Sequence, residues 1–191
     1  MGTRDQIVDA ADQLFYQQGF EHTSFADIAN AVNISRGNFY YHFKTKDDIL
    51  DAVIDLRLAN TQRMLDQWQQ QGDRPRDRIL CFIHILIANQ SKILLYGCPV
   101  GTLTSELAKL DHAALDKASS VFSLFRGWLT QQFSALGMAD NADALAMHVL
   151  ARSQGIATLA SAFNDKNFIN HEVNQLCLWL DNQCGGKKEV S

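Results

Sequence analysis

The chain has 191 residues, of which 47% are hydrophobic and 20% charged, and its net charge is −4 at pH 7. This length suits one compact unit or two small ones, and the apolar fraction supports a buried core and excludes general disorder. The longest apolar run, Ile79 to Ala88, is about half a membrane span, and no secretory signal pattern opens the chain. We therefore expect a soluble, cytoplasmic protein that does not span a membrane.

The four cysteines, Cys81, Cys98, Cys177 and Cys184, are far apart in the sequence. They lack the paired spacing that a zinc site or a redox dithiol requires. We expect reduced thiols, with no metal and no cofactor.

Apolar residues recur at helical spacing through nearly the whole chain, and only Pro75 and Pro99 interrupt them. This pattern predicts an all-α protein. The expected helices, about nine in all, cover residues 3–18, 24–32, 35–43, 46–70, 76–95, 98–110, 111–135, 141–164 and 167–183.

Residues 23–46 contain the signals of two short helices joined by a tight turn. Ser24 and Asp27 have capping-box spacing at the start of the first helix, and Ser35 is positioned to cap the second. Asn33 lies between them, where the chain must reverse, and asparagine tolerates the left-handed conformation of such a turn. The sequence therefore predicts a helix-turn-helix.

The second of these helices is the candidate DNA-reading helix, because Phe39 and Phe43 face inward and polar side chains face outward. Residues 36–46 carry a net charge of +3, whereas the rest of the chain carries −7. Residues 36–46 are therefore the only segment whose charge favours contact with the phosphates of a DNA backbone. The candidate DNA-binding residues are Thr23, Ser24, Ser35, Arg36, Gly37, Asn38, Tyr40, Tyr41, His42 and Lys46.

Among these candidates, different groups suit different parts of DNA. Arg36 and Asn38, near the helix start, are expected to approach base edges, whereas Tyr41 and Lys46 are expected to contact phosphates. The simplest structural interpretation of the two consecutive tyrosines, Tyr40 and Tyr41, is that one of the rings packs inward. Both cannot face inward on one helix, so at least one remains available.

The segment T-S-F-A-D-I-A-N-A-V-N-I-S-R-G-N-F-Y-Y-H-F-K-T-K-D-D-I-L resembles the DNA-binding segment of the tetracycline-repressor (TetR) family. The resemblance runs from roughly Arg4 to Val53. Asn33 stands where the family usually has glycine, and Arg36 stands where lysine is common. The resemblance implies a ligand-responsive transcriptional regulator, most readily a repressor, that binds a palindromic operator as a homodimer.

The expected division of the chain follows from the long helix and the family resemblance. Residues 1–50 form the helix-turn-helix domain, residues 51–184 form a helical effector-binding and dimerisation domain, and residues 185–191 form a disordered tail. The last two helices have more apolar surface than one buried side requires. The candidate dimerisation residues are Leu145, Val149, Ile156, Leu159, Phe163, Leu176, Trp179 and Leu180.

Two features suggest how the larger domain senses an effector. Phe82, Phe125 and Trp128 are candidates to line a pocket, although aromatic residues at helical spacing also serve simply as core. Cys98 lies at a helix start, where the helix dipole stabilises a thiolate. The segment G-C-P-V-G-T-L-T-S-E-L-A around it resembles a subgroup of the family in which some members respond to electrophiles or oxidants. The alternative is that Cys98 is a small buried hydrophobe.

Two other functions are compatible with parts of this pattern. An architectural DNA-binding protein without an effector would show no inducible release from DNA. An enzyme that uses Cys98 as nucleophile would need a supporting histidine, and no evident motif supplies one. We therefore predict a non-enzymatic regulator whose partners are operator DNA, a second copy of itself and a small-molecule or electrophilic effector.

Overall fold

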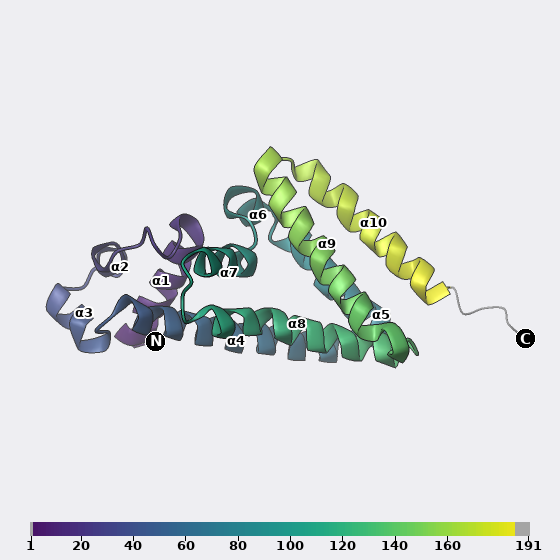
Figure 1. Cartoon of the computed structure of the whole chain (residues 1–191), viewed down its shortest axis with the longest axis horizontal. Coiled ribbons are helices and arrows are strands. Elements are labelled where there is room, and N and C mark those ends of the chain that lie inside the picture. Colours follow the sequence, from purple (N-terminus) through teal and green to yellow (C-terminus); the bar gives the residue numbers. More distant parts are fainter. Residues whose placement is uncertain (1, 186–191) are drawn as a thin grey trace, which may run out of the picture. The chain divides into compact units, whose positions relative to one another are not determined.

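The computed structural model describes residues 2–185, which form ten α-helices and one short 3-10 helix, with no strand in this range (Figure 1). The helices are α1 (Thr3–Gln18), α2 (Phe25–Ala31), α3 (Arg36–His42), α4 (Lys46–Gln71), α5 (Pro75–Ala88), α6 (Gln90–Tyr96), α7 (Pro99–Lys109), α8 (Leu115–Ala135), η1 (Ala139–Asn141), α9 (Ala142–Phe163) and α10 (Lys166–Gly185). The all-α prediction is confirmed.

Several features of the helix ends follow from the residue types found there. Gly19 and Asn33 adopt positive φ angles of 92° and 54° where α1 and α2 end. Pro99 is the first residue of α7, and the Ser24–Asp27 capping box is present at the start of α2. These features depend on residues within a few positions of one another, so the sequence alone reveals them.

The single helix predicted over residues 76–95 is wrong, because Asn89 divides it into α5 and α6. The Asn89 backbone leaves helical geometry at φ −107° and ψ 11°. Its side-chain amide donates a hydrogen bond to the Ile85 carbonyl at 3.0 Å. Asparagine side chains compete for backbone groups in this way and thereby interrupt helices.

The chain packs into two compact units. Within the described residues, unit 1 comprises residues 2–61 and Pro99–Val121, and unit 2 comprises Gln62–Cys98 and residues 122–185. These units do not coincide with the predicted division at residue 50, because α7 and most of α4 share one core with the first three helices.

The core of unit 1 is built on apolar stripes of its helices. Ile7 and Phe15 of α1, Ile28 of α2 and Phe39 of α3 are buried together with Leu107 of α7. Burying side chains of this size stabilises by roughly 1.5–3 kcal/mol each. This core holds α2 and α3 in place.

In unit 2, α10 packs against α5 and α9, and α9 also packs against α6. Figure 1 shows α9 and α10 side by side as a green and yellow pair. The predicted tail began at residue 185, but Gly185 ends α10, and residues 186–191 lie outside the described part of the chain.

The predicted dimerisation residues fall into three groups. Val149, Ile156, Leu176 and Leu180 are buried within this chain's own core, so they are not available to a partner. That part of the prediction is wrong, because α9 and α10 direct these side chains toward each other and toward their neighbouring helices in unit 2.

The other four residues remain accessible. Leu159 and Phe163 of α9 are 44% and 75% exposed, whereas Leu145 and Trp179 are half-buried. An accessible apolar surface therefore persists on this helix pair, although it is smaller than predicted.

The three aromatic residues predicted to line a pocket are buried in unit 2. The rings of Phe82 and Phe125 meet edge to face, with centroids 5.2 Å apart. Trp128 contacts Trp68 at 5.7 Å between ring centroids. These residues pack as core side chains, which is the alternative that the sequence left open.

Within residues 2–185, no single helix is both long and apolar enough to cross a membrane, although the bent pair 75–88 and 90–109 reaches that length and composition together.

Candidate nucleic-acid interface

Helix α3 depends on its neighbours for stability, because seven residues are too few to hold a helix in water. Phe39 and Phe43 anchor it, with 1% and 3% of their surfaces exposed. Ser35 caps its start, and the Ser35 hydroxyl accepts a hydrogen bond from the Asn38 N–H at 3.3 Å. The buried aromatic side leaves the opposite side of α3 facing outward.

The outward side of α3 carries most of the predicted DNA-binding residues. Arg36, Gly37 and Asn38 are exposed at its start. Tyr41 is 79% exposed, whereas Tyr40 is 45% exposed. The Tyr40 ring packs edge to face on a neighbouring phenylalanine of α2 at 5.5 Å. Tyr41 is therefore the outward member of the tyrosine pair.

His42 ends α3 and is half-buried, with its ring 5.2 Å from the Tyr41 ring. Ser24 and Ser35 are exposed, and both hydroxyls are engaged as helix caps. The Ser24 hydroxyl donates to Asp27 at 2.6 Å and accepts from its backbone N–H at 3.2 Å. The two serines therefore fix the starts of α2 and α3, which is a structural role separate from any contact with DNA.

Thr23 was assigned to DNA binding, and the structure contradicts this assignment. The residue is 1% exposed. Its hydroxyl donates to the Gly19 carbonyl at 2.7 Å and accepts from the Gln18 side chain at 3.2 Å. Thr23 instead closes the turn between α1 and α2, because its hydroxyl satisfies a backbone carbonyl there.

The basic residues of the reader segment have distinct surroundings. Lys44 donates to the Tyr40 carbonyl at the end of α3. Lys46 donates to the carbonyls of Phe20 and Glu21 at 3.0 and 3.2 Å, and its ammonium lies 4.3 Å from the centre of the Phe20 ring. Two of the three N–H donors of Lys46 are thus used within unit 1.

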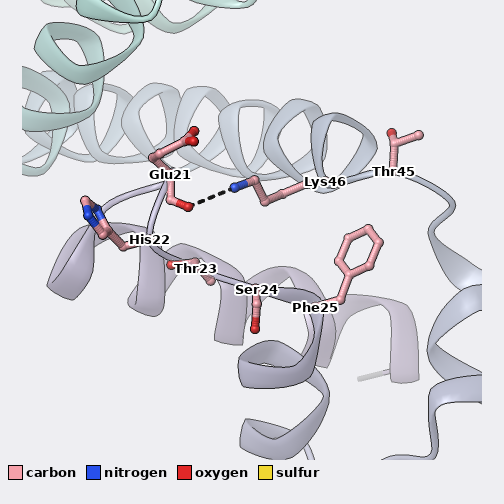
Figure 2. Close-up of a pocket in the computed structure, with 7 residues that line it drawn as sticks. All are labelled: Glu21, His22, Thr23, Ser24, Phe25, Thr45 and Lys46. Carbon is pink, nitrogen blue, oxygen red and sulfur yellow. Dashed lines mark hydrogen bonds between the residues drawn. The ribbon is translucent and has the colours of Figure 1, made fainter.

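Figure 2 shows the shallow hollow in which Lys46 lies, between the start of α2 and the start of α4. The hollow is lined by Glu21, His22, Thr23, Ser24, Phe25, Thr45 and Lys46. The Lys46 ammonium points toward the backbone of the α1–α2 turn rather than into solvent.

Glu106 of α7, which no pattern in the sequence singles out, contacts the same turn. Its two carboxylate oxygens accept hydrogen bonds from the backbone N–H groups of Phe20 and Glu21 at 2.9 and 2.8 Å. No local pattern signals this contact, because the partners lie 86 and 85 positions apart in the sequence.

The connection between α3 and α4 is fixed by a capping box of Thr45 and Asp48. The Asp48 carboxylate accepts from the Thr45 N–H at 2.9 Å, and the Thr45 hydroxyl accepts from the Asp48 N–H at 3.0 Å. The backbone N–H of Thr45, followed by its hydroxyl, holds the pKa of Asp48 below its ordinary value. The ionised carboxylate therefore stabilises this connection.

Cys98 is half-buried and directly precedes α7. The other three cysteines lie within helices, and burial raises the pKa of the Cys81, Cys177 and Cys184 thiols. A raised pKa reduces the thiolate fraction at neutral pH, so these three thiols are poor nucleophiles.

A small helix held by buried aromatic residues, with a polar and basic outer side, is the arrangement of a helix-turn-helix DNA-binding segment. Comparison with known proteins gives the family. Residues 7–53 match the model for bacterial regulatory proteins of the tetR family. Residues 7–53 are therefore a TetR-family DNA-binding segment, and the chain as a whole is similar to regulators of that family.

The resemblance to individual relatives extends beyond this segment. A helix-turn-helix-type transcriptional regulator in the lacX 3′ region of Lactococcus lactis subsp. lactis is 29% identical over 91% of both chains. The transcriptional regulator AcrR of Shigella flexneri is 36% identical over 44% of this chain and 39% of its own length. The crystal structure of a TetR transcriptional regulator from Legionella pneumophila has the same fold, with a TM-score of 0.83 and 24% identity over 96% of this chain and 97% of that one.

Replacing Asp48 with Asn should lower thermal stability at pH 7, because the substitution removes the ionised cap of α4. The folded-state pKa of Asp48 lies below its ordinary value, so the carboxylate stabilises the fold at neutral pH and loses this effect as the pH falls. The difference in melting temperature between wild type and D48N should therefore shrink below about pH 4.

Asp73→Asn serves as the control, since Asp73 is exposed in the loop before α5. D73N should melt like wild type at both pH values. A difference in melting temperature between wild type and D48N that stays constant down to about pH 2–3, below the ordinary pKa of a carboxyl group, would contradict this role of Asp48.

Proposed function

We propose that this protein is a transcriptional repressor that binds a partly palindromic operator as a homodimer and is released by an effector. The exposed outer side of α3, opposite the buried Phe39 and Phe43, is the observation that carries the proposal. A helix presented in this way enters the major groove, where base edges are distinguishable.

The positions of the side chains on α3 support separate roles in recognition. Arg36 and Asn38 are exposed in its first turn, where they approach base edges. Tyr41 lies at the other end of α3 and its hydroxyl contacts a phosphate. Lys46 has one N–H left for a phosphate after its two contacts with the α1–α2 turn.

Asn38→Ala should relax the base preference, because it removes a group that reads a base edge, at a cost of about 1–3 kcal/mol at that position. Tyr41→Phe should weaken binding to all sequences alike, because it removes only a phosphate contact. Fluorescence anisotropy with the operator and a set of single-base variants measures both effects. Identical sequence profiles for the two variants would contradict the assignment.

The accessible apolar residues of α9 and α10 support dimerisation through these helices. Leu159 and Phe163 are one helical turn apart on α9, and Met147 of α9 and Leu178 of α10 are also exposed. Exposed apolar side chains on a helix pair are well suited to an isologous interface, in which two copies form a four-helix contact. Two readers in one dimer would match the two half-sites of an operator.

Leu159→Glu should give monomers in analytical ultracentrifugation and abolish tight operator binding, because it places a charge in the apolar interface. Leu95→Glu is the matched control, since Leu95 is 68% exposed on α6 and lies outside this surface. L95E should remain a dimer. A monomeric L159E protein that still bound the operator tightly would refute the link between dimerisation and DNA binding.

Two features of unit 2 support an effector response. The indole Nε1 of Trp128 is buried and has no acceptor among the described residues, so a polar ligand that entered this part of the core would find an unpaired donor there. An unpaired buried donor costs about 1–3 kcal/mol, which such a ligand would offset. Residues of α4 and α8 belong to both units, so a change in unit 2 can reach unit 1 through these continuous helices.

Cys98 is the proposed sensor when the effector is an electrophile or an oxidant, because it directly precedes α7. Hypochlorite or an alkylating electrophile should release wild-type protein from DNA and leave Cys98→Ser bound. Cys177→Ser is the control and should respond like wild type, since burial raises the pKa of the Cys177 thiol. Equal release of wild type and C98S would make Cys98 structural and the effector a reversibly bound molecule. No release by any effector would favour an architectural DNA-binding protein.

A further inference from the structure

The turn between α1 and α2 is held by two charged side chains from distant parts of the sequence. Glu106 of α7 accepts from the N–H groups of Phe20 and Glu21 at 2.9 and 2.8 Å. Lys46 of α4 donates to the carbonyls of the same two residues at 3.0 and 3.2 Å. All four backbone polar groups of these residues are therefore satisfied by ionic partners, which form stronger hydrogen bonds than neutral groups.

Gly19 shows that the turn is shaped around the Glu106 carboxylate. A Cβ atom at Gly19 would lie 3.0 Å from Oε1 and 3.2 Å from Oε2 of Glu106. Gly19 also has a φ of 92°, which disfavours residues with a side chain. Glycine thus permits both the turn conformation and the close approach of the carboxylate.

Helix α7 is fixed at its other end as well. Arg57 of α4 donates to the Pro99 carbonyl at 2.6 Å and to the Asp12 carboxylate of α1 at 2.6 Å. Leu103 and Leu107, on either side of Glu106 in the sequence, are buried in the core shared with α1 to α4. Helix α7 is therefore tied to the DNA-binding segment by one charged contact near each end and by apolar packing.

The α1–α2 turn leads directly into the reader segment. Thr23 closes the turn and Ser24 caps α2. Phe25, the first residue of α2, packs on Phe39 of α3 with ring centroids 5.1 Å apart. A change in the turn therefore shifts α2 and, through this ring contact, the buried anchor of the reader helix.

We propose that Glu106 is a positioning residue for operator binding, which holds the α1–α2 turn and thereby sets the position of α2 and α3. The proposal rests on the proposed function, in which α3 reads DNA. It makes α7 the element through which a change elsewhere in the chain alters the reader, because the carboxylate travels with α7 while the amides that it binds belong to the turn.

Glu106→Gln is the decisive variant. The glutamine side chain has nearly the same shape, but its single oxygen can accept from only one of the two N–H groups, and its amide is a donor that faces the other. Operator affinity should fall about tenfold. This is the size expected when one charge-assisted hydrogen bond is lost and the glutamine N–H donor faces a backbone N–H donor of the turn. Simple electrostatics gives the opposite sign, because removing an acidic charge strengthens attraction to DNA.

Glu21→Gln is the matched control. Glu21 is exposed in the same turn, and only its backbone takes part in the contacts with Glu106 and Lys46. The substitution removes the same charge from the same region, so E21Q should bind the operator as tightly as wild type or slightly more tightly. Affinity for E106Q equal to that of E21Q would overturn the proposal.

Amide hydrogen exchange in the DNA-free protein gives a readout that does not depend on operator binding. Exchange at Phe20 and Glu21 should be about tenfold faster in E106Q than in wild type, with core amides such as that of Leu50 unchanged. Unchanged exchange at Phe20 and Glu21 would overturn the contact, and equal acceleration at Leu50 would show general destabilisation instead.

Two further outcomes separate this proposal from the proposed function. If wild type binds no DNA while exchange responds as expected, the regulator function fails and Glu106 is only a structural contact. If E106Q does not fold, Glu106→Asp replaces it, because aspartate keeps the charge but is one methylene shorter. E106D should also bind more weakly and exchange faster at the two turn amides, and wild-type behaviour in both measurements would refute the positioning role.

Discussion

The burial of Phe39 and Phe43 is the constraint on which the DNA-binding surface depends. Helix α3 has seven residues, so it cannot persist without tertiary support. Two phenylalanines one turn apart commit one side of it to the core. The polar residues on the opposite side, including Asn38, are then presented outward as a consequence of packing.

That support comes from more of the chain than the reader segment itself. The core that buries Phe39 includes Ile49 and Val53 of α4 and Leu107 of α7. A DNA-binding domain assembled from two separate chain segments is sensitive to both of them, since neither buries its apolar surface alone. The charged contacts of Arg57 and Glu106 add direction to this packing, because they fix where α7 lies along unit 1.

Unit 2 divides its apolar residues between two uses. Val149 and Leu176 fill its own core, whereas Leu159 and Phe163 remain on the surface of α9. Helices α9 and α10 are therefore neither wholly buried nor wholly exposed on their apolar sides. The same amphipathic pattern specifies both sides of each helix, which explains why periodicity alone assigned too many residues to the interface.

The sequence by itself determined the features that depend on neighbouring residues. Most helix limits follow from interactions within a few positions, although the break at Asn89 was not predicted. The capping boxes at Ser24 and Thr45, the left-handed Asn33 and the proline start of α7 have the same local origin. The exposed side of α3 also followed, because Phe39 and Phe43 have helical spacing.

Only the tertiary structure decided which predicted residues are accessible and which distant groups meet. Thr23 has a hydroxyl of the kind that contacts DNA, yet this hydroxyl is hydrogen-bonded within the turn that buries it. Lys46 serves two carbonyls of that turn, and Glu106 reaches the same turn from 86 positions away. Contacts over such separations depend on how helices pack in three dimensions, and a linear pattern of residue types does not encode that packing locally.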